Sequence, residues 1–101
     1  MSAHRVYVLP SAGKEIDRLP GHVRQRVRRA VLGLRDNVEP DSAIQLRHDL
    51  RSGYEIWRLR LDTWRVVYVL DREWGSVYVL AVRKRPPYQY EDLASLLAHL
   101  E

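Results

Sequence analysis

The chain has 101 residues, of which 46% are hydrophobic, and this suits a single domain with one core over residues 1–101. It has no cysteine, which excludes disulfides, thiolate metal sites and a cysteine nucleophile. Seventeen Lys and Arg against thirteen Asp and Glu give a formal charge of +4, which favours a nucleic-acid or acidic partner. The four histidines lack metal-binding spacing, so we expect neither a metal nor another cofactor.

The N-terminal residues predict a strand followed by a short helix. His4–Leu9 alternates weakly in hydrophobicity and is followed by a proline, as expected of a strand. Ser11 stands where a helix N-cap belongs, and the helix it opens should end before Pro20. The apolar run is too short for a signal peptide or a membrane span, so we expect a cytoplasmic protein without membrane contact.

A longer amphipathic helix is predicted from Gly21 to about Asn37. Apolar residues recur there every three or four positions, and the opposite side carries Arg24, Arg26, Arg28 and Arg29. A charged face of this kind is typical of a solvent-exposed helix surface. Non-specific contact with RNA or the ribosome is the alternative, and no helix-turn-helix pattern supports DNA recognition.

The second half predicts an antiparallel meander of three strands over Tyr54–Arg85, interrupted at Asp62-Thr63 and again at Asp71–Gly75. Ala43–Leu50 fits either a short fourth strand or an extended lead-in. Glu91–Glu101 has the leucine spacing of a short terminal helix. The predicted fold class is therefore α+β: the meander with its N-terminal strand, two N-terminal helices on one face, and a C-terminal helix.

Alternation within the meander predicts a face rich in arginine. Arg58 and Arg60 fall on one side of the first run, because successive side chains of a strand point to opposite faces. If Asp62-Thr63 is a two-residue loop, Arg60 pairs with Arg65 and both share that side. Like charges opposite each other destabilise a sheet, so such a face suggests an anionic ligand.

The third run adds further cations to this face. An odd number of residues in the preceding turn would add Arg83 and Arg85, and an even number would add Lys84 instead. Arg65 also has a purely structural alternative, an ion pair with Glu55 or Asp71.

The order of elements, together with the runs WRLRLDTWRVVYVLD and VYVLAVRKRPPYQYEDL, resembles the RelE/ParE superfamily of bacterial toxin–antitoxin toxins. The similarity spans essentially the whole chain. It implies a toxin neutralised by a cognate antitoxin protein. In the RelE-like branch, which we favour, the toxin is a ribosome-dependent endoribonuclease that cuts mRNA and so inhibits translation.

Two alternatives within the same resemblance remain open. A toxin of the ParE kind inhibits DNA gyrase without cutting nucleic acid, and a degenerate member binds its antitoxin and does no more. The fold does not choose among them.

The resemblance also implies catalytic residues. Arg65 matches the arginine that stabilises the scissile phosphate, and Arg85 matches the arginine after the last strand. Arg58 falls where RelE has a catalytic lysine. Tyr88 or Tyr90 corresponds to the family's C-terminal tyrosine.

The general base is open, because another lysine position of RelE is Ile56 here, and because an arginine with a pKa above about 12 cannot accept a proton at neutral pH. The candidates for the base are His48, Lys84, Tyr88 and Tyr90. For RNA binding we predict Arg60, Arg83, Lys84 and His48, with the ribosome and mRNA as partners besides the antitoxin.

Overall fold

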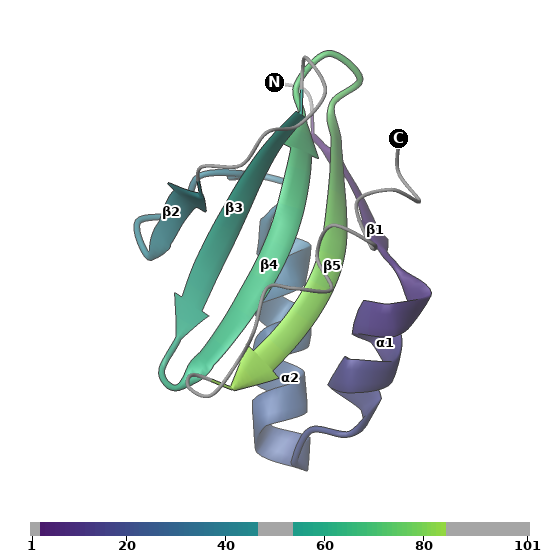
Figure 1. The fold of residues 1–101 in the computed structure, drawn as a ribbon, viewed down its shortest axis with the longest axis vertical. Helices are drawn as coiled ribbons and strands as arrows, with labels where there is room; N and C mark the ends of the chain where they lie inside the picture. Colours follow the sequence, from purple (N-terminus) through teal and green to yellow (C-terminus); the bar gives the residue numbers. More distant parts are fainter. Residues whose placement is uncertain (1–2, 47–53, 85–101) are drawn as a thin grey trace.

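The computed structural model describes residues 3–46 and 54–84 and has the α+β architecture predicted from the sequence. Its elements are β1 (Arg5–Val8), α1 (Pro10–Asp17), α2 (Gly21–Gly33), β2 (Ala43–Leu46), β3 (Tyr54–Leu61), β4 (Trp64–Asp71) and β5 (Ser76–Lys84). The strands form one sheet in the order β1-β5-β4-β3-β2 (Figure 1). β1 is parallel to β5, and the other neighbouring strands are antiparallel. The C-terminal helix predicted at 91–101 lies outside the described residues.

The hairpin between β3 and β4 has the predicted two-residue loop. Leu61 pairs with Trp64, and Arg60 pairs with Arg65. Asp62 adopts a positive φ of 54°, a conformation that aspartate tolerates better than most residues do. Its carboxylate forms an ion pair with Arg26 of α2, and this hydrogen bond keeps the pKa of Asp62 below its ordinary value. The loop length therefore fixes the register on which the arginine face depends.

The turn between β4 and β5 spans residues 72–75, an even number, yet it is Arg83 that pairs with Arg65. The expectation that an even turn would bring Lys84 to this face is wrong. The cause is a β-bulge, since Tyr68 pairs with Val79 whereas Val67 pairs with Ala81, which leaves one extra residue on β5. The extra residue moves every later side chain of β5 to the opposite face of the sheet. Arg83 therefore lies on the arginine side, where an even turn without a bulge would have placed Lys84.

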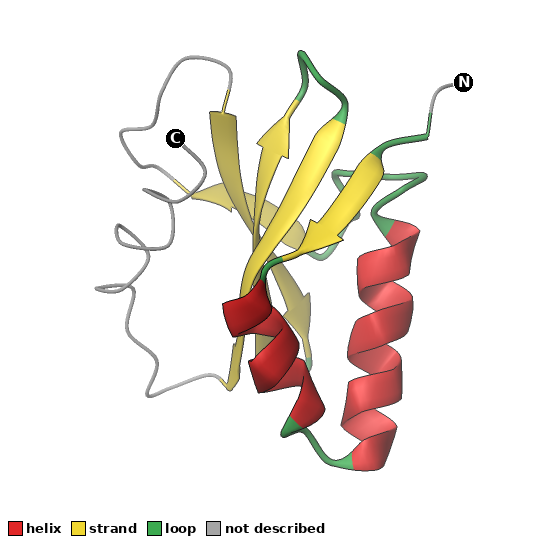
Figure 2. Ribbon diagram, turned by 90° about the vertical axis from the view of Figure 1, so that its right-hand side faces the viewer, coloured by secondary structure: helices red, strands yellow, loops and turns green. Residues whose placement is uncertain are grey.

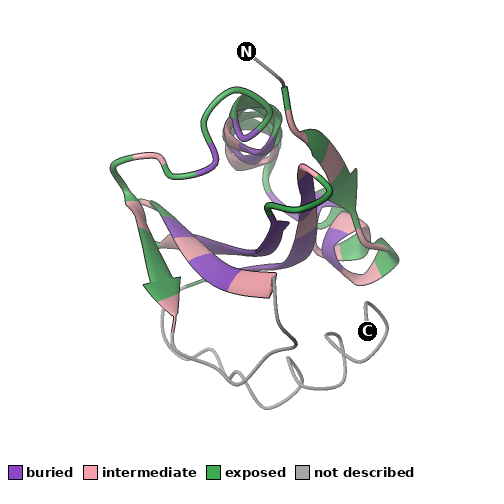
Figure 3. Cartoon of the chain, turned by 90° about the horizontal axis from the view of Figure 1, so that it is seen from above, coloured by how far each residue is buried: buried purple, intermediate pink, exposed green. Residues whose placement is uncertain are grey.

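One face of the sheet packs against the two helices (Figure 2). The residues of this face form the larger core cluster with Val27 and Val31 of α2 and Ile16 of α1. Within it, the buried hydroxyl of Tyr68 donates a hydrogen bond of 2.7 Å to the carbonyl of Val38. Buried residues gather in the central strands, whereas the edge strands β1 and β2 are mostly exposed or half-buried (Figure 3). The three central strands, β3, β4 and β5, therefore supply most of the buried residues of the sheet.

The start of the first helix differs from the prediction. α1 begins at Pro10, and Ser11 lies inside it rather than at the N-cap, which is Leu9. Proline suits the first helical position because its fixed φ is helical and its missing N–H would have no partner there. The Ser11 hydroxyl instead donates to the Leu80 carbonyl of β5 at 3.2 Å. A hydrogen bond to a distant strand thus takes the place of the local N-cap hydrogen bond that the sequence predicts for Ser11.

The second helix is shorter than predicted and ends at Gly33. Its arginines lie at the surface, where Arg28 pairs with Asp17 at 3.5 Å and Arg24 reaches the Asp17 carbonyl at 3.4 Å. Exposed pairs of this kind contribute about 0–1 kcal/mol. The prediction of a solvent-exposed charged face is therefore confirmed in the structure.

Candidate functional site: an arginine face

The sheet face opposite the helices carries four arginines, Arg58, Arg60, Arg65 and Arg83, which we call the arginine face. Arg60, Arg65 and Arg83 come from β3, β4 and β5 and are directly paired across the strands. Arg58 lies two residues before Arg60, paired with Val67. Residues paired across antiparallel strands share a face, so three cations stand in one row.

Arg65, at the centre of this row, is 4% exposed. Its Nη1 donates to the carbonyls of Asp62 and Trp64, at 2.7 and 2.9 Å. Its Nε is buried and has no hydrogen-bond partner, and no carboxylate within the described ranges forms an ion pair with it. A buried donor without an acceptor costs about 1–3 kcal/mol, and such donors are rare in native structures.

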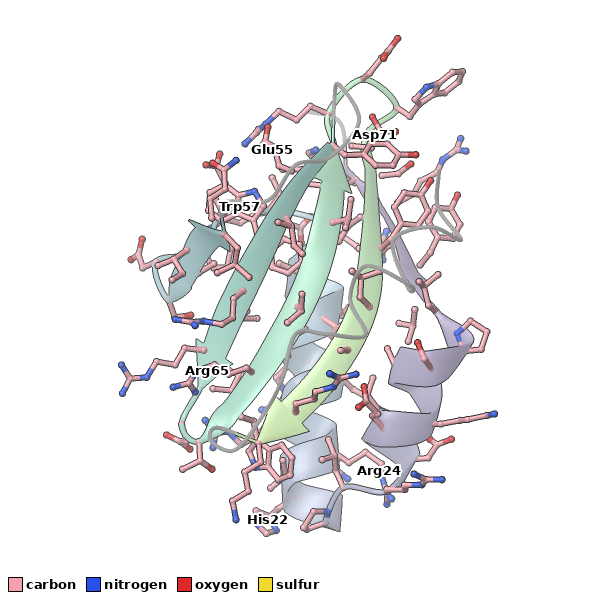
Figure 4. The ribbon with its side chains drawn as sticks, viewed as in Figure 1. His22, Arg24, Glu55, Trp57, Arg65 and Asp71 are labelled. Atoms are coloured by element: carbon pink, nitrogen blue, oxygen red, sulfur yellow. The ribbon has the colours of Figure 1, made fainter. Side chains whose placement is uncertain are left out.

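Arg65 does not form the ion pair with Glu55 or Asp71 that its structural alternative predicts. Figure 4 shows Arg65 near one end of the sheet, whereas Glu55 and Asp71 lie near the other end. Glu55 instead accepts hydrogen bonds from Arg72 at 2.8 Å and from the Trp57 indole at 3.1 Å. The bond from Arg72 is the main reason that the pKa of Glu55 is lowered. The Asp71 carboxylate accepts the Trp74 amide in the next turn.

Arg83 is held by a residue that sequence reasoning missed. Its Nε donates to Glu15 of α1 at 3.1 Å, across 68 positions of sequence. Glu15 lies in a short helix whose pattern predicts only an apolar stripe and a polar remainder. Nothing local in the sequence indicates this contact, because it depends on how α1 packs beside β5.

Of the other residues considered for the site, the structure describes Lys84 and Ile56. Lys84 pairs with Trp64, which packs against the helix-side core, so Lys84 lies on the face opposite Arg65. Ile56 is 2% exposed and packs with Val67 and Val69 on the arginine side. The remaining predicted residues, His48, Arg85, Tyr88 and Tyr90, lie outside the described residues, so the structure does not test their roles.

Over 3–46 and 54–84, no three His, Asp or Glu side chains gather in a way that could hold a metal ion. None of the helices in these ranges has the length and hydrophobicity that crossing a bilayer requires. Arginine is a weakly hydrated, planar cation suited to bidentate phosphate contacts. The arrangement therefore offers preorganised positive charge for an anion.

No family model matches the sequence, and a search of curated proteins found no match. Solved structures do match. The RelE–RelB complex from Pyrococcus horikoshii has a TM-score of 0.75 at 20% identity, over 85% of this chain and 99% of that one. The toxin–antitoxin complex RelBE2 from Mycobacterium tuberculosis gives 0.68 at 25% identity, over 82% and 99%.

The isolated toxin RelE from E. coli gives a TM-score of 0.63 at 20% identity, over 98% of this chain and all of that one. The resemblance that the sequence indicates is thus confirmed at the level of the fold, and the matches support a toxin of a toxin–antitoxin system. The chain has a RelE-like fold, the fold of toxins that have been solved alone and in complex with RelB antitoxins.

Proposed function

We propose that this protein is the toxin of a type II toxin–antitoxin system and that it inhibits translation by cutting mRNA on the ribosome, in the cytoplasm, without a metal ion. The observation that carries the proposal is Arg65. It is a buried guanidinium with an orphaned Nε and no acid partner in the described ranges, at the centre of a row of arginines. Its Nη1 bonds to the Asp62 and Trp64 carbonyls hold the guanidinium in place, while its charge is left without a carboxylate in the described ranges, which supports a role in stabilising an anion such as RNA phosphate.

The chemistry of RNA cleavage explains the need for such a row. Attack of the 2′-hydroxyl on the neighbouring phosphorus builds negative charge on the phosphoryl oxygens before the 5′-oxygen leaves. Fixed guanidinium groups stabilise that charge, and removing one such donor typically lowers the rate by about 10²–10³-fold. We assign this role to Arg65, Arg58 and Arg85, of which Arg85 lies outside the described residues, and RNA binding to Arg60 and Arg83.

The proton-transfer groups must come from other residues. Arginine stays protonated, and the buried Ile56 offers no amine. Lys84 lies on the other side of the sheet, which disfavours it as the base. We therefore propose that the base is His48, Tyr88 or Tyr90, with a tyrosine activated by surrounding cations.

The test is translation in a purified ribosome system with added protein, followed by primer extension on the message. Cuts at A-site codons are expected with the wild-type protein and should vanish with Arg65→Ala. Arg29→Ala is the matched control, because it removes the same charge from an exposed position of α2. An uncut message with active ribosomes would contradict the nuclease proposal.

Inhibition of DNA gyrase, as in the ParE branch, is the second candidate. The burial of Ile56 at a lysine position of RelE favours it, because a non-nucleolytic inhibitor needs no base. Supercoiling by purified gyrase decides the point: loss of supercoiling with an intact message would support this candidate. If neither activity appears and induction leaves cells unharmed, the protein binds its antitoxin and does no more.

For the antitoxin we propose an amphipathic helix with acidic residues beside its apolar stripe. Several of the similar solved structures are toxin–antitoxin complexes, including the RelE–RelB complex from Pyrococcus horikoshii. In this chain a pocket of about 470 Å³ between β1, α1 and α2 is lined by apolar residues such as Val8 and Leu32, which are 43% and 58% exposed. Arg28, Arg35 and Asp17 also line it, and Asp17 pairs with Arg28, so the lining has a net positive charge that an acidic residue beside the apolar stripe would complement.

The antitoxin proposal has a direct test. A small acidic protein encoded beside this gene should co-purify with the chain, and Leu32→Asp should weaken the complex by placing a carboxylate in the apolar pocket. Gln25→Asp, which adds the same charge at another exposed position of α2, should leave binding unchanged. Equal weakening by both variants would contradict this pocket as the docking site.

A further inference from the structure

The outer edge of β5 is only half covered by β1. β1 pairs with β5 from Ser76 to Val79, whereas β5 continues to Lys84. Beyond Val79, no described strand lies on that side of β5. Unpaired backbone groups at a sheet edge must find partners in water or in neighbouring side chains.

Helix α1 supplies those partners with its side chains. The Ser11 hydroxyl donates to the Leu80 carbonyl at 3.2 Å, and Glu15 Oε1 accepts from the Val82 amide at 3.0 Å. Ser11 and Glu15 are four residues apart and so lie on one side of the helix. Together they take the place of the strand that β5 lacks at this point.

The second oxygen of Glu15 reaches the arginine face. Glu15 Oε2 accepts from Arg83 Nε at 3.1 Å, and the two side chains are 28% and 22% exposed. One carboxylate therefore joins the β5 backbone at Val82 to the side chain of the next residue. Arg60, at the other end of the row, is exposed and has no ion pair within the described ranges. The row is thus fixed at one end only.

We propose that Glu15 is a positioning residue of the arginine face: its carboxylate seals the edge of β5 and fixes the direction of the Arg83 guanidinium beside Arg65. This proposal rests on the proposed function, in which the arginine face contacts RNA phosphate. Glu15 offsets part of the repulsion between the paired arginines while leaving the charge of Arg65 unneutralised. A guanidinium held in place loses less conformational freedom when phosphate binds, so the effect should appear in the cleavage rate.

The test is a double-mutant cycle on the rate of message cleavage at saturating protein. Glu15→Gln keeps an oxygen for the Val82 amide and removes the charge that orients Arg83. We expect it to lower the rate about tenfold in the wild-type background and less than about twofold in an Arg83→Ala background, as for residues that act through one contact. Glu73→Gln is the control, because it makes the same charge change in an exposed turn. Equal losses in both backgrounds, or no loss, would overturn the proposal.

A second readout keeps this proposal separate from the proposed function. In NMR spectra, the Arg83 Nε–H signal should exchange slowly with water in the wild type and rapidly in Glu15→Gln, while the Val82 amide stays protected in both. If the wild-type protein does not cut RNA, the proposed function fails, and this signal alone decides whether Glu15 holds Arg83. Equally rapid exchange in the wild type would overturn the positioning role.

Discussion

The two faces of one sheet differ in how completely their side chains are satisfied. On the helix face, Val66, Tyr68 and Leu70 of β4 are fully buried against the helices, and the one hydroxyl among them has its acceptor. On the arginine face the same strand carries Arg65, which is equally enclosed but has an orphaned Nε and no acid partner in the described ranges. The first face follows the rules of stable packing, and the second breaks them at one residue. Local violations of this kind are expected at functional sites.

This difference predicts that the helix face carries stability and the arginine face carries activity. Substitutions on each face should therefore separate the free energy of unfolding from the rate of message cleavage.

Leu70→Ala should have the largest effect on stability. The side chain is 0% exposed within the helix-side core, and truncation of a buried leucine costs about 2–5 kcal/mol. Chemical denaturation measures the change, with Leu32→Ala at an exposed position of α2 as the control, which should stay within about 0.5 kcal/mol of wild type. A similar loss from both variants would contradict the account of the core.

Arg65→Met should abolish activity and leave stability near that of the wild type. Methionine fills similar volume and removes a buried charge together with its unsatisfied Nε, and this gain offsets the loss of the two bonds to the Asp62 and Trp64 carbonyls. The cleavage rate should fall about 100-fold or more, as for loss of a transition-state donor. Arg65→Lys, which keeps the charge but not the planar fork, should recover only part of the rate. A variant that is both unfolded and inactive would assign Arg65 to structure.

Tyr68→Phe should lower the free energy of unfolding by about 0.5–1.5 kcal/mol, because the Val38 carbonyl loses its donor. Burial also raises the pKa of Tyr68 above its ordinary value. The stabilisation is therefore complete below the unfolded pKa, about 10, and is lost as the pH rises above it. Denaturation at several alkaline pH values should show a steeper decline for the wild type than for Tyr68→Phe. Parallel curves would contradict the role of burial.

Glu55→Gln should have the smallest effect, about 0–1 kcal/mol, because its partner Arg72 is half exposed and solvent screens the pair. The bond from Arg72 lowers the pKa of Glu55, so its contribution is present above the unfolded pKa, about 4.3, and is lost as the pH falls through the lowered value. Acid denaturation of wild type and variant should therefore converge at low pH. The cleavage rate should not change.

Local patterns predicted much of this molecule, because helix and strand periodicity survive in any tertiary context. The meander, the two-residue loop at Asp62-Thr63 and the facing of Arg58, Arg60 and Arg65 all follow from alternation and turn length. The end of α2 and the position of Ser11 were predicted less well. Helix ends depend on packing and on competing hydrogen bonds, such as the one from Ser11 to β5.

The sequence by itself determined the fold class, the RelE-like resemblance and the arginines of β3 and β4, since each depends on residues close together in the chain. Only the tertiary structure decided that Arg83 joins the row, because a bulge in β5 turns the side chains after it to the opposite face from the one that the length of the preceding turn predicts. It also decided that Arg65 has no acid partner in the described ranges and that Glu15 holds Arg83. Those facts depend on contacts between distant segments, which no local pattern encodes.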